Sequence, residues 1–168
     1  IRGFGETITR NFRDKLAMRR RAFDEGVLAP DFAHLVNESK IHDFIQRVPA
    51  PWIVKPRGEA SAIGVKKVNT PEELWNIYEE LGDRRSMYLV EQFLPGDILH
   101  VDSLAYEGKI VFAAVSKYGK TPFEVMHGGG IFPTRLVEHG SSDEKEALKA
   151  NQIVLQAMGL RYGASHTE

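Results

Sequence analysis

The spacing of apolar residues changes along this chain between the period of a helix and that of a strand. Ile41, Phe44 and Val48 follow helical spacing, and Pro51 lies beyond the point where that pattern stops. The run Trp52-Ile53-Val54-Lys55, directly afterwards, is typical of a strand. Because helices and strands are mixed in this way and the strands are joined by hairpin-like turns, the sequence predicts an α+β fold.

Capping residues locate two of the helices. Thr70 can cap a helix in which Pro71 occupies the first turn and Glu73 completes a capping box. Ser141 with Glu144 offers a second capping box. The helices expected are residues 11–25, 38–48, 70–81 and 141–158. The strands expected are residues 52–55, 63–68, 87–94, 99–106, 109–117 and 161–168, with loops at 56–62 and 118–133.

The strands at 99–106 and 109–117 predict a hairpin that turns at Glu107-Gly108. The cross-strand pairs expected from that turn are Tyr106 with Lys109, Leu104 with Val111, and Asp102 with Ala113. His100, Asp102 and Lys117 would then share one face of the sheet. In the last strand, alternation makes His166 and Glu168 point to the same side.

Composition excludes several classes of function. The chain has 22 Lys and Arg against 23 Asp and Glu, a formal net charge of -1, so we expect no nucleic-acid partner. It has no cysteine, which removes disulfides, thiolate metal sites and cysteine nucleophiles. The longest apolar run, residues 110–115, is far shorter than the roughly 20 residues that span a bilayer. With no signal peptide visible, we expect a cytoplasmic protein with no membrane partner.

The sequence does not contain a complete P-loop, the glycine-rich motif that binds phosphates in many nucleotide-binding proteins. Gly119-Lys120-Thr121 follows an apolar strand, but Ala114 stands where a P-loop needs its first glycine. We also expect a loop, and not a helix, after Pro122. The three arginines at 19–21 could contact the phosphates of a nucleic acid, although a solvated helix face explains them more simply.

Four features in sequence order predict one site for a polyphosphate. Lys55 ends a strand, and residues 58–64 form a small-residue loop whose backbone N–H groups could surround phosphate oxygens. Glu91 ends another strand and is followed by apolar residues, an arrangement that can offer backbone groups to an adenine edge. Glu168 could hold Mg²⁺, which prefers oxygen ligands. Each feature alone has a plain explanation as a surface lysine, a rim carboxylate or a frayed end; their order favours the site.

The segments that carry a family resemblance are 14–19 (DKLAMR), 53–56 (IVKP) with 61–65 (SAIGV), 90–96 (VEQFLPG), 100–102 (HVD) and 163–168 (GASHTE). In this order they resemble the ATP-grasp superfamily, in particular its biotin carboxylase-like and carbamoyl-phosphate synthase-like members. The resemblance implies two α+β lobes with ATP held between them. It divides the chain into a helical lead-in (1–50), a smaller lobe with the glycine-rich loop (51–96) and part of a larger lobe (97–168). Since the chain starts at Ile1, we expect a fragment that lacks an N-terminal lobe and the end of the larger lobe.

The resemblance also assigns roles to residues. It implies that Lys15 and Lys55 contact the ATP phosphates, that His100 lies on the ribose side, and that Glu168 binds Mg²⁺. The glycine-rich lid would comprise Ser61, Ala62, Ile63 and Gly64, and the adenine edge Glu91, Gln92 and Leu94. Apart from the resemblance, the expected place of Lys117 on the face of His100 makes it a candidate catalytic residue, together with Arg135, and residues 118–135 are a candidate substrate loop.

The function implied is that of an ATP-dependent ligase. A carboxylate or bicarbonate would be activated as an acyl phosphate and then attacked by an amine or another nucleophile, so the partners are small molecules. The alternative is a non-catalytic or regulatory ATP-binding module, which Ile98 favours, because many relatives carry a ribose-binding glutamate at that position. We expect the fragment to be inactive alone, and its exposed apolar face could form a homo-oligomer.

Overall fold

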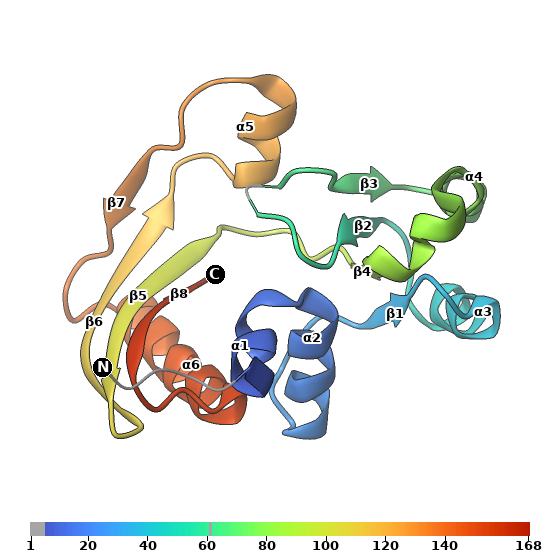
Figure 1. Ribbon diagram of the computed structural model, residues 1–168. Coiled ribbons are helices and arrows are strands. Elements are labelled where there is room, and N and C mark those ends of the chain that lie inside the picture. The colour runs from blue at the N-terminus through green and yellow to red at the C-terminus, as the bar shows by residue number, and fades with distance from the viewer. Residues whose placement is uncertain (1–5, 61) are drawn as a thin grey trace.

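Two four-stranded antiparallel sheets make up the fold, as the computed structural model of residues 6–60 and 62–168 shows (Figure 1). The smaller lobe contains, in spatial order, β1 (Phe32–His34), β4 (Tyr88–Gln92), β2 (Trp52–Pro56) and β3 (Lys66–Val68). The larger lobe contains β7 (Thr134–Leu136), β6 (Lys109–Tyr118), β5 (Leu99–Tyr106) and β8 (Gly163–Thr167). This arrangement confirms the α+β fold class.

Two helices cover one face of the smaller sheet. They are α3 (Glu38–Arg47) and α4 (Pro71–Leu81), and the short 3₁₀ helix η1 (Gly82–Met87) follows α4. Phe44, Trp52 and Leu74 are fully buried in the core that they share. Thr70 caps α4 as predicted, because its side chain accepts the N–H of Glu73 at 3.2 Å. This core also includes residues of β1 and α3, so the smaller lobe extends back to Phe32, upstream of residue 51.

The larger sheet packs one face on α6 (Ser142–Met158). Val101, Ser103 and Ala105 alternate along β5 on this buried face, and Asn151 of α6 donates to Ser103 Oγ at 2.7 Å. Gly159 ends α6 in a left-handed conformation, as its position after Met158 predicts. His100 and Asp102 therefore project from the other face. Among the helices of residues 6–60 and 62–168, none has the length and apolar character needed to cross a membrane.

The single helix expected at residues 11–25 is wrong, because Asp14 divides it into α1 (Glu6–Arg13) and α2 (Lys15–Asp24). The Asp14 carboxylate caps α2 by accepting the N–H groups of Leu16 at 3.0 Å and Ala17 at 3.3 Å. Arg57, which follows β2, donates to the same carboxylate, with Nε at 3.1 Å. The partner that fixes this break lies 43 residues away, so helical periodicity could not reveal it.

The hairpin turns where predicted, but most of its pairing is shifted by one residue. Tyr106 lies opposite Lys109 as expected, whereas a bulge between Leu104 and Ala105 sets Leu104 opposite Phe112 and Asp102 opposite Ala114. The two pairs predicted beyond the bulge are therefore wrong. A shift of one residue moves each side chain to the other face. Lys117 consequently pairs with Leu99 and faces away from His100, while Tyr118 takes the His100 face.

The loop expected at residues 118–133 contains a helix, α5 (Pro122–Gly128). Thr121 and Glu124 form a complete capping box, and Pro122 occupies the first turn. The expectation that no helix follows Pro122 is therefore wrong, because a local capping signal was overlooked. Ala114 still occupies the position of the first P-loop glycine.

Replacing Asp14 with Asn tests the contact that fixes the start of α2. Asparagine can still cap the helix, so this change removes chiefly the ion pair with Arg57. That pair lowers the pKa of Asp14 to about 2. Allowing for screening by solvent, we expect the free energy of unfolding at pH 7 to fall by about 1 kcal/mol.

The sign of the pH dependence follows from the lowered pKa of Asp14. The ion pair contributes its full stability above the unfolded pKa near 3.8 and loses it as the pH falls towards about 2. Urea unfolding followed by circular dichroism should show the difference between parent and Asp14→Asn shrinking below about pH 4. Asp24→Asn, in an exposed pair with Arg20, is the control and should stay within about 0.5 kcal/mol of the parent. An equal loss in both variants would contradict the prediction.

Candidate functional site

Two basic side chains bond to Glu91, and a third lies nearby. Lys55 of β2 donates to Glu91 Oε1, and Arg19 of α2 donates to Glu91 Oε2 at 3.0 Å. Lys15 lies one turn before Arg19 on α2, and its charge acts on Lys55 while Glu91 acts on both lysines. Figure 1 shows α2 between the two sheets. Lys15 and Lys55 therefore lie near the same carboxylate, and their contact with ATP phosphates stays a prediction.

This group, Lys15, Arg19, Lys55 and Glu91, carries more positive than negative charge. The side chains of Lys55 and Glu91 are only 13% and 8% exposed. Burial is the largest influence on Lys55 and lowers its pKa, while the Glu91 carboxylate raises it. Burial also lowers the pKa of Lys15, with the nearby Arg13 charge acting in the same direction. Since one carboxylate balances only one of three cations, the group fits a polyanion such as the triphosphate of ATP.

The predicted glycine-rich lid begins beside this group. Lys15 Nζ donates to the Glu59 carbonyl oxygen, which links α2 to the loop. Ala62 and Gly64 have positive φ values of 58° and 71°, which glycine adopts freely and alanine rarely. The Ile63 N–H donates within the loop to Ala60 O at 3.2 Å. Ser61 lies outside the described residues.

The predicted adenine edge has most of its N–H groups engaged. The Gln92 N–H donates to Asp31 O at 2.8 Å, and the Phe93 N–H donates to Pro51 O at 3.2 Å. Leu94, the third predicted residue of this edge, is 58% exposed. We did not predict that the Glu91 carboxylate would form ion pairs with both Arg19 and Lys55.

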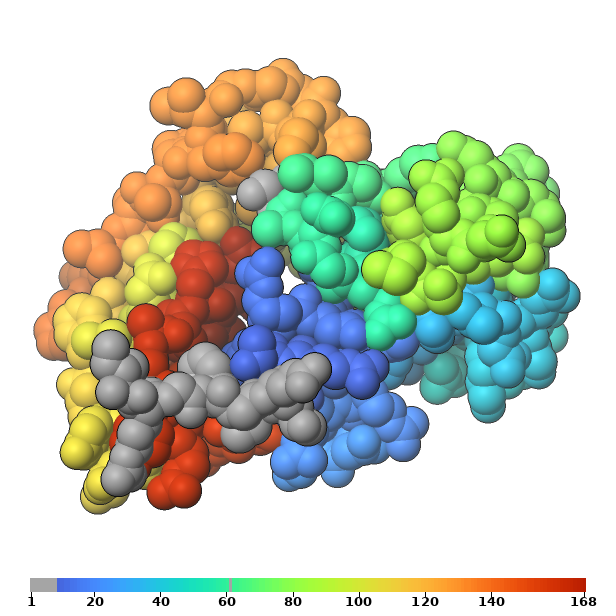
Figure 2. Space-filling model, in the orientation of Figure 1, coloured from blue at the N-terminus to red at the C-terminus, as the bar shows by residue number. Residues whose placement is uncertain are grey.

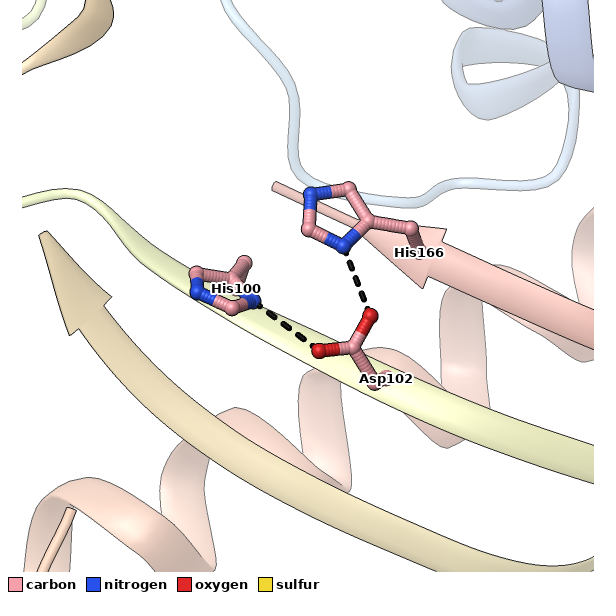
Figure 3. A group of neighbouring side chains, drawn as sticks. All are labelled: His100, Asp102 and His166. Atoms are coloured by element: carbon pink, nitrogen blue, oxygen red, sulfur yellow. Dashed lines mark hydrogen bonds and ion pairs between the residues drawn. The ribbon is translucent and has the colours of Figure 1, made fainter. Parts of the chain in front are cut away.

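A second group lies on the larger sheet and consists of His100, Asp102, Tyr118, His166 and Glu168. Asp102 Oδ1 lies 2.7 Å from His166 Nδ1, and Asp102 Oδ2 lies 3.2 Å from His100 Nδ1 (Figure 3). The hydrogen bond from His166 is the main reason why the pKa of Asp102 is lowered. Tyr118 donates its hydroxyl to Glu168 Oε1 at 2.8 Å. Burial and the Glu168 carboxylate raise the pKa of Tyr118 to about 12, so the phenol stays protonated as a donor.

Glu168, the predicted Mg²⁺ ligand, directly follows β8, and this end of the chain lies in the space between the two sheets (Figure 1). Figure 2 shows the surface hollowed where this red segment, the blue N-terminal helices and the blue-green loop after β2 meet. Glu168 Oε1 also lies 3.7 Å from His166 Nε2, which confirms that the two side chains point the same way. An oxygen ligand at this position suits Mg²⁺.

The two candidate catalytic residues lie on the other face of the larger sheet. Lys117 pairs with Asp97 at 2.5 Å, and Arg135 of β7 lies opposite Lys117 in the sheet. The prediction that Lys117 shares a face with His100 is therefore wrong, because the bulge in the hairpin shifts the pairing of β5 and β6 by one residue. His100 itself is 6% exposed, and its Nε2 lies 2.9 Å from Thr134 Oγ1.

Sequence analysis did not assign Arg19, Tyr118 and His166 of these groups to the site, nor Thr134, which lies beside His100. Arg19 had a signal, because it follows Lys15 by four residues and so lies on the same helix face. The others are placed by strand register. A cavity of about 450 Å³ between β3, α4 and α5, lined by Lys66, Ile77 and Phe123 among others, is separate from all the predicted residues.

Comparison with known proteins identifies the family. The model of the family described as "D-ala D-ala ligase C-terminus" matches residues 26–123. The chain belongs to this family. A curated relative, the D-alanine--D-alanine ligase of Aquifex aeolicus, is 27% identical over 85% of this chain and 47% of its own length. The L-arginine-specific L-amino acid ligase of Bacillus subtilis is 24% identical over 92% of this chain and 38% of its own length.

Solved structures share the fold. The crystal structure of L-amino acid ligase from Bacillus licheniformis matches with a TM-score of 0.73 and 20% identity, covering 99% of this chain and 38% of that chain. D-alanine--D-alanine ligase from Bacillus anthracis gives a TM-score of 0.70 and 17% identity, covering 98% and 53%. Together with the family, these matches confirm the resemblance to ATP-grasp proteins. The chain spans less than half of the length of the two curated relatives.

Replacing Glu91 with Gln tests the charge balance of the basic group. The change leaves Lys55 and Arg19 without their shared counter-charge at a mostly buried position. We expect the free energy of unfolding to fall by about 3 kcal/mol, measured by urea denaturation. Because an added anion can replace the lost charge, tripolyphosphate should raise the melting temperature more in Glu91→Gln than in the parent. Glu80→Gln, in an exposed pair with Lys66, is the matched control. A loss below about 1 kcal/mol would show that these pairs do not stabilise the fold.

Proposed function

We propose that this chain is the ATP-binding part of a ligase that joins a carboxylate to an amine. The observation that carries the proposal is that Arg19 and Lys55 bond to one buried carboxylate, Glu91, with the charge of Lys15 close by. Two of these cations, Arg19 and Lys55, are mostly buried, and a surplus of positive charge around them is costly unless an anion joins it. In a chain of this family, between two α+β lobes, the triphosphate of ATP is the anion that fits.

The proposed reaction has two steps. A carboxylate oxygen attacks the γ-phosphorus of ATP, the bond to the β–γ bridging oxygen breaks, and an acyl phosphate and ADP result. The amine nitrogen then attacks the acyl carbon, phosphate leaves, and the amine loses a proton. Lys15 and Lys55 would hold the phosphates in line and offset their charge, which is the main source of rate in phosphoryl transfer. Glu168 would hold Mg²⁺, whose charge assists at the phosphates.

Most of the remaining predicted residues complete the proposed site. Ala62 to Gly64, with Ser61, would close over the phosphates, and Glu91, Gln92 and Leu94 would border the adenine. His100, on the face of the larger sheet that carries Glu168, would lie on the ribose side. Lys117 and Arg135 lie on the other face of the larger sheet, so the proposal gives them no contact with substrate.

Amino acids are the proposed substrate class. The relatives named above are D-alanine--D-alanine and L-amino acid ligases, names that describe the joining of amino acids. We therefore favour an amino-acid carboxylate over bicarbonate, with the amine of a second amino acid as the nucleophile.

Calorimetric titration of the full-length protein with MgATP tests the nucleotide site. Lys55→Ala removes a charged contact to phosphate, so we expect affinity to fall by roughly tenfold to a hundredfold. Lys40→Ala, which removes an exposed lysine that pairs with Asp43 on α3, should bind as the parent does. Circular dichroism would establish that both variants are folded.

Phosphate release then separates the ligase from the alternative. Amino-acid-dependent release of phosphate by the parent, with formation of a dipeptide, would support the ligase. Tight MgATP binding without such release would favour a non-catalytic ATP-binding module. If the folded parent does not bind MgATP, both the ligase and the ATP-binding module are excluded.

A further inference from the structure

A cluster of two histidines and one aspartate on the larger sheet, which includes His100, has a chemistry different from that of the basic group around Glu91. His100 and Asp102 alternate on one face of β5, and β8 sets His166 directly opposite Asp102. Figure 3 shows the Asp102 carboxylate reaching both rings, one with each oxygen. One ligand atom from each residue can be chosen so that all three lie within 4.8 Å of one another. Among the described residues, no other group of three histidine, aspartate or glutamate side chains brings its ligand atoms this close together.

A buried nitrogen in this cluster lacks a hydrogen-bond partner. His100 is 6% exposed, and its Nδ1 lies 3.2 Å from Asp102 Oδ2 without hydrogen-bonding geometry. Buried polar atoms in folded proteins nearly always have a partner, so this nitrogen requires an explanation. A group bound between His100 and Asp102 would supply one.

The neighbours of His100 indicate which of its nitrogens carries the proton. Thr134 Oγ1 donates to the Lys117 carbonyl oxygen at 3.4 Å, which leaves its lone pairs to accept from His100 Nε2, at 2.9 Å. With the proton on Nε2, the lone pair of Nδ1 faces the Asp102 carboxylate. Two electron-rich atoms that face each other at this distance favour a cation between them, and a ligating histidine is commonly oriented by a hydrogen bond at its other nitrogen.

We propose that His100, Asp102 and His166 bind a divalent transition-metal ion, with Zn²⁺ as the reference ion. Two imidazole nitrogens and one carboxylate oxygen are a ligand set that Zn²⁺ and its neighbours in the series prefer, whereas Mg²⁺ prefers oxygen ligands alone. Burial holds His100 in place, while the side chains of Asp102 and His166 are 51% and 49% exposed and can move inward to bonding distance. This site does not depend on the proposed ligase activity.

The bound ion would connect two strands at a position that matters for the larger lobe. Because β8 is the edge strand of its sheet, His166 would be tied to β5 through the metal as well as through backbone hydrogen bonds. Glu168 follows two residues later, so the ion would also fix the end of the strand that carries this carboxylate. Zn²⁺ binding should therefore raise the melting temperature of the protein.

The test is calorimetric titration of chelator-treated full-length protein with ZnCl₂, with MgCl₂ in excess to fill sites made of oxygen alone. We expect one equivalent of Zn²⁺ to bind and the melting temperature to rise. His166→Gln and Asp102→Asn alter part-exposed side chains, and each should weaken binding by roughly tenfold or more. Replacing Zn²⁺ with Co²⁺ should give a visible absorption band that both variants lose.

His139→Gln is the matched control, because His139 pairs with Glu144 at 3.1 Å on the surface as a histidine–carboxylate pair without a third ligand. It should bind Zn²⁺ as the parent does, and circular dichroism would establish that all variants fold. Absence of saturable binding at one equivalent, or unchanged affinity in folded His166→Gln and Asp102→Asn, would overturn the proposal. A parallel titration with inorganic phosphate tests the competing explanation, that the cluster binds an anion. Phosphate binding that His166→Gln abolishes, without Zn²⁺ binding, would make the cluster an anion site and would also overturn it.

Discussion

The Glu91 carboxylate connects the central helix α2 to the smaller sheet, and the basic group is organised around this contact. Lys55 approaches one oxygen from β2, and Arg19 approaches the other from α2. Charged groups removed from water are tolerated when each finds a partner of opposite sign, so this carboxylate allows two cations to lie side by side. On its other side α2 contacts α6, where Arg21 donates to Ala157 O at 2.8 Å. The same helix thus joins the two lobes and presents Lys15 at its start.

The bulge in the β5–β6 hairpin has the corresponding role in the larger lobe. One extra residue in β6 brings Tyr118 and Thr134 to the face of His100 and moves Lys117 and Arg135 to the other face. The first face gathers imidazoles, a phenol and carboxylates, while the basic side chains near the end of the sheet lie on the second. A single backbone irregularity therefore determines which chemistry is available beside Glu168.

The two groups differ in a way that suits different ligands. The group around Glu91 has surplus positive charge and favours an anion, whereas the cluster of His100, Asp102 and His166 offers lone pairs and favours a cation. Under the proposed function, ATP would lie between these two surfaces, with its phosphates beside the basic group and Mg²⁺ beside Glu168.

The sequence by itself determined the α+β class, the turn at Glu107-Gly108 and the helices that Thr70 and Ser141 cap. Caps and tight turns are contacts between residues a few positions apart, so their signals are local. The order of the motifs also predicted that Lys15 and Lys55 would meet. Tertiary structure alone decided the break at Asp14, the short strand β1, the position of Arg19 on Glu91 and the pairing of His166 with Asp102. Each of these depends on partners that are tens of residues away, and local spacing carries no record of such partners or of the register that brings them together.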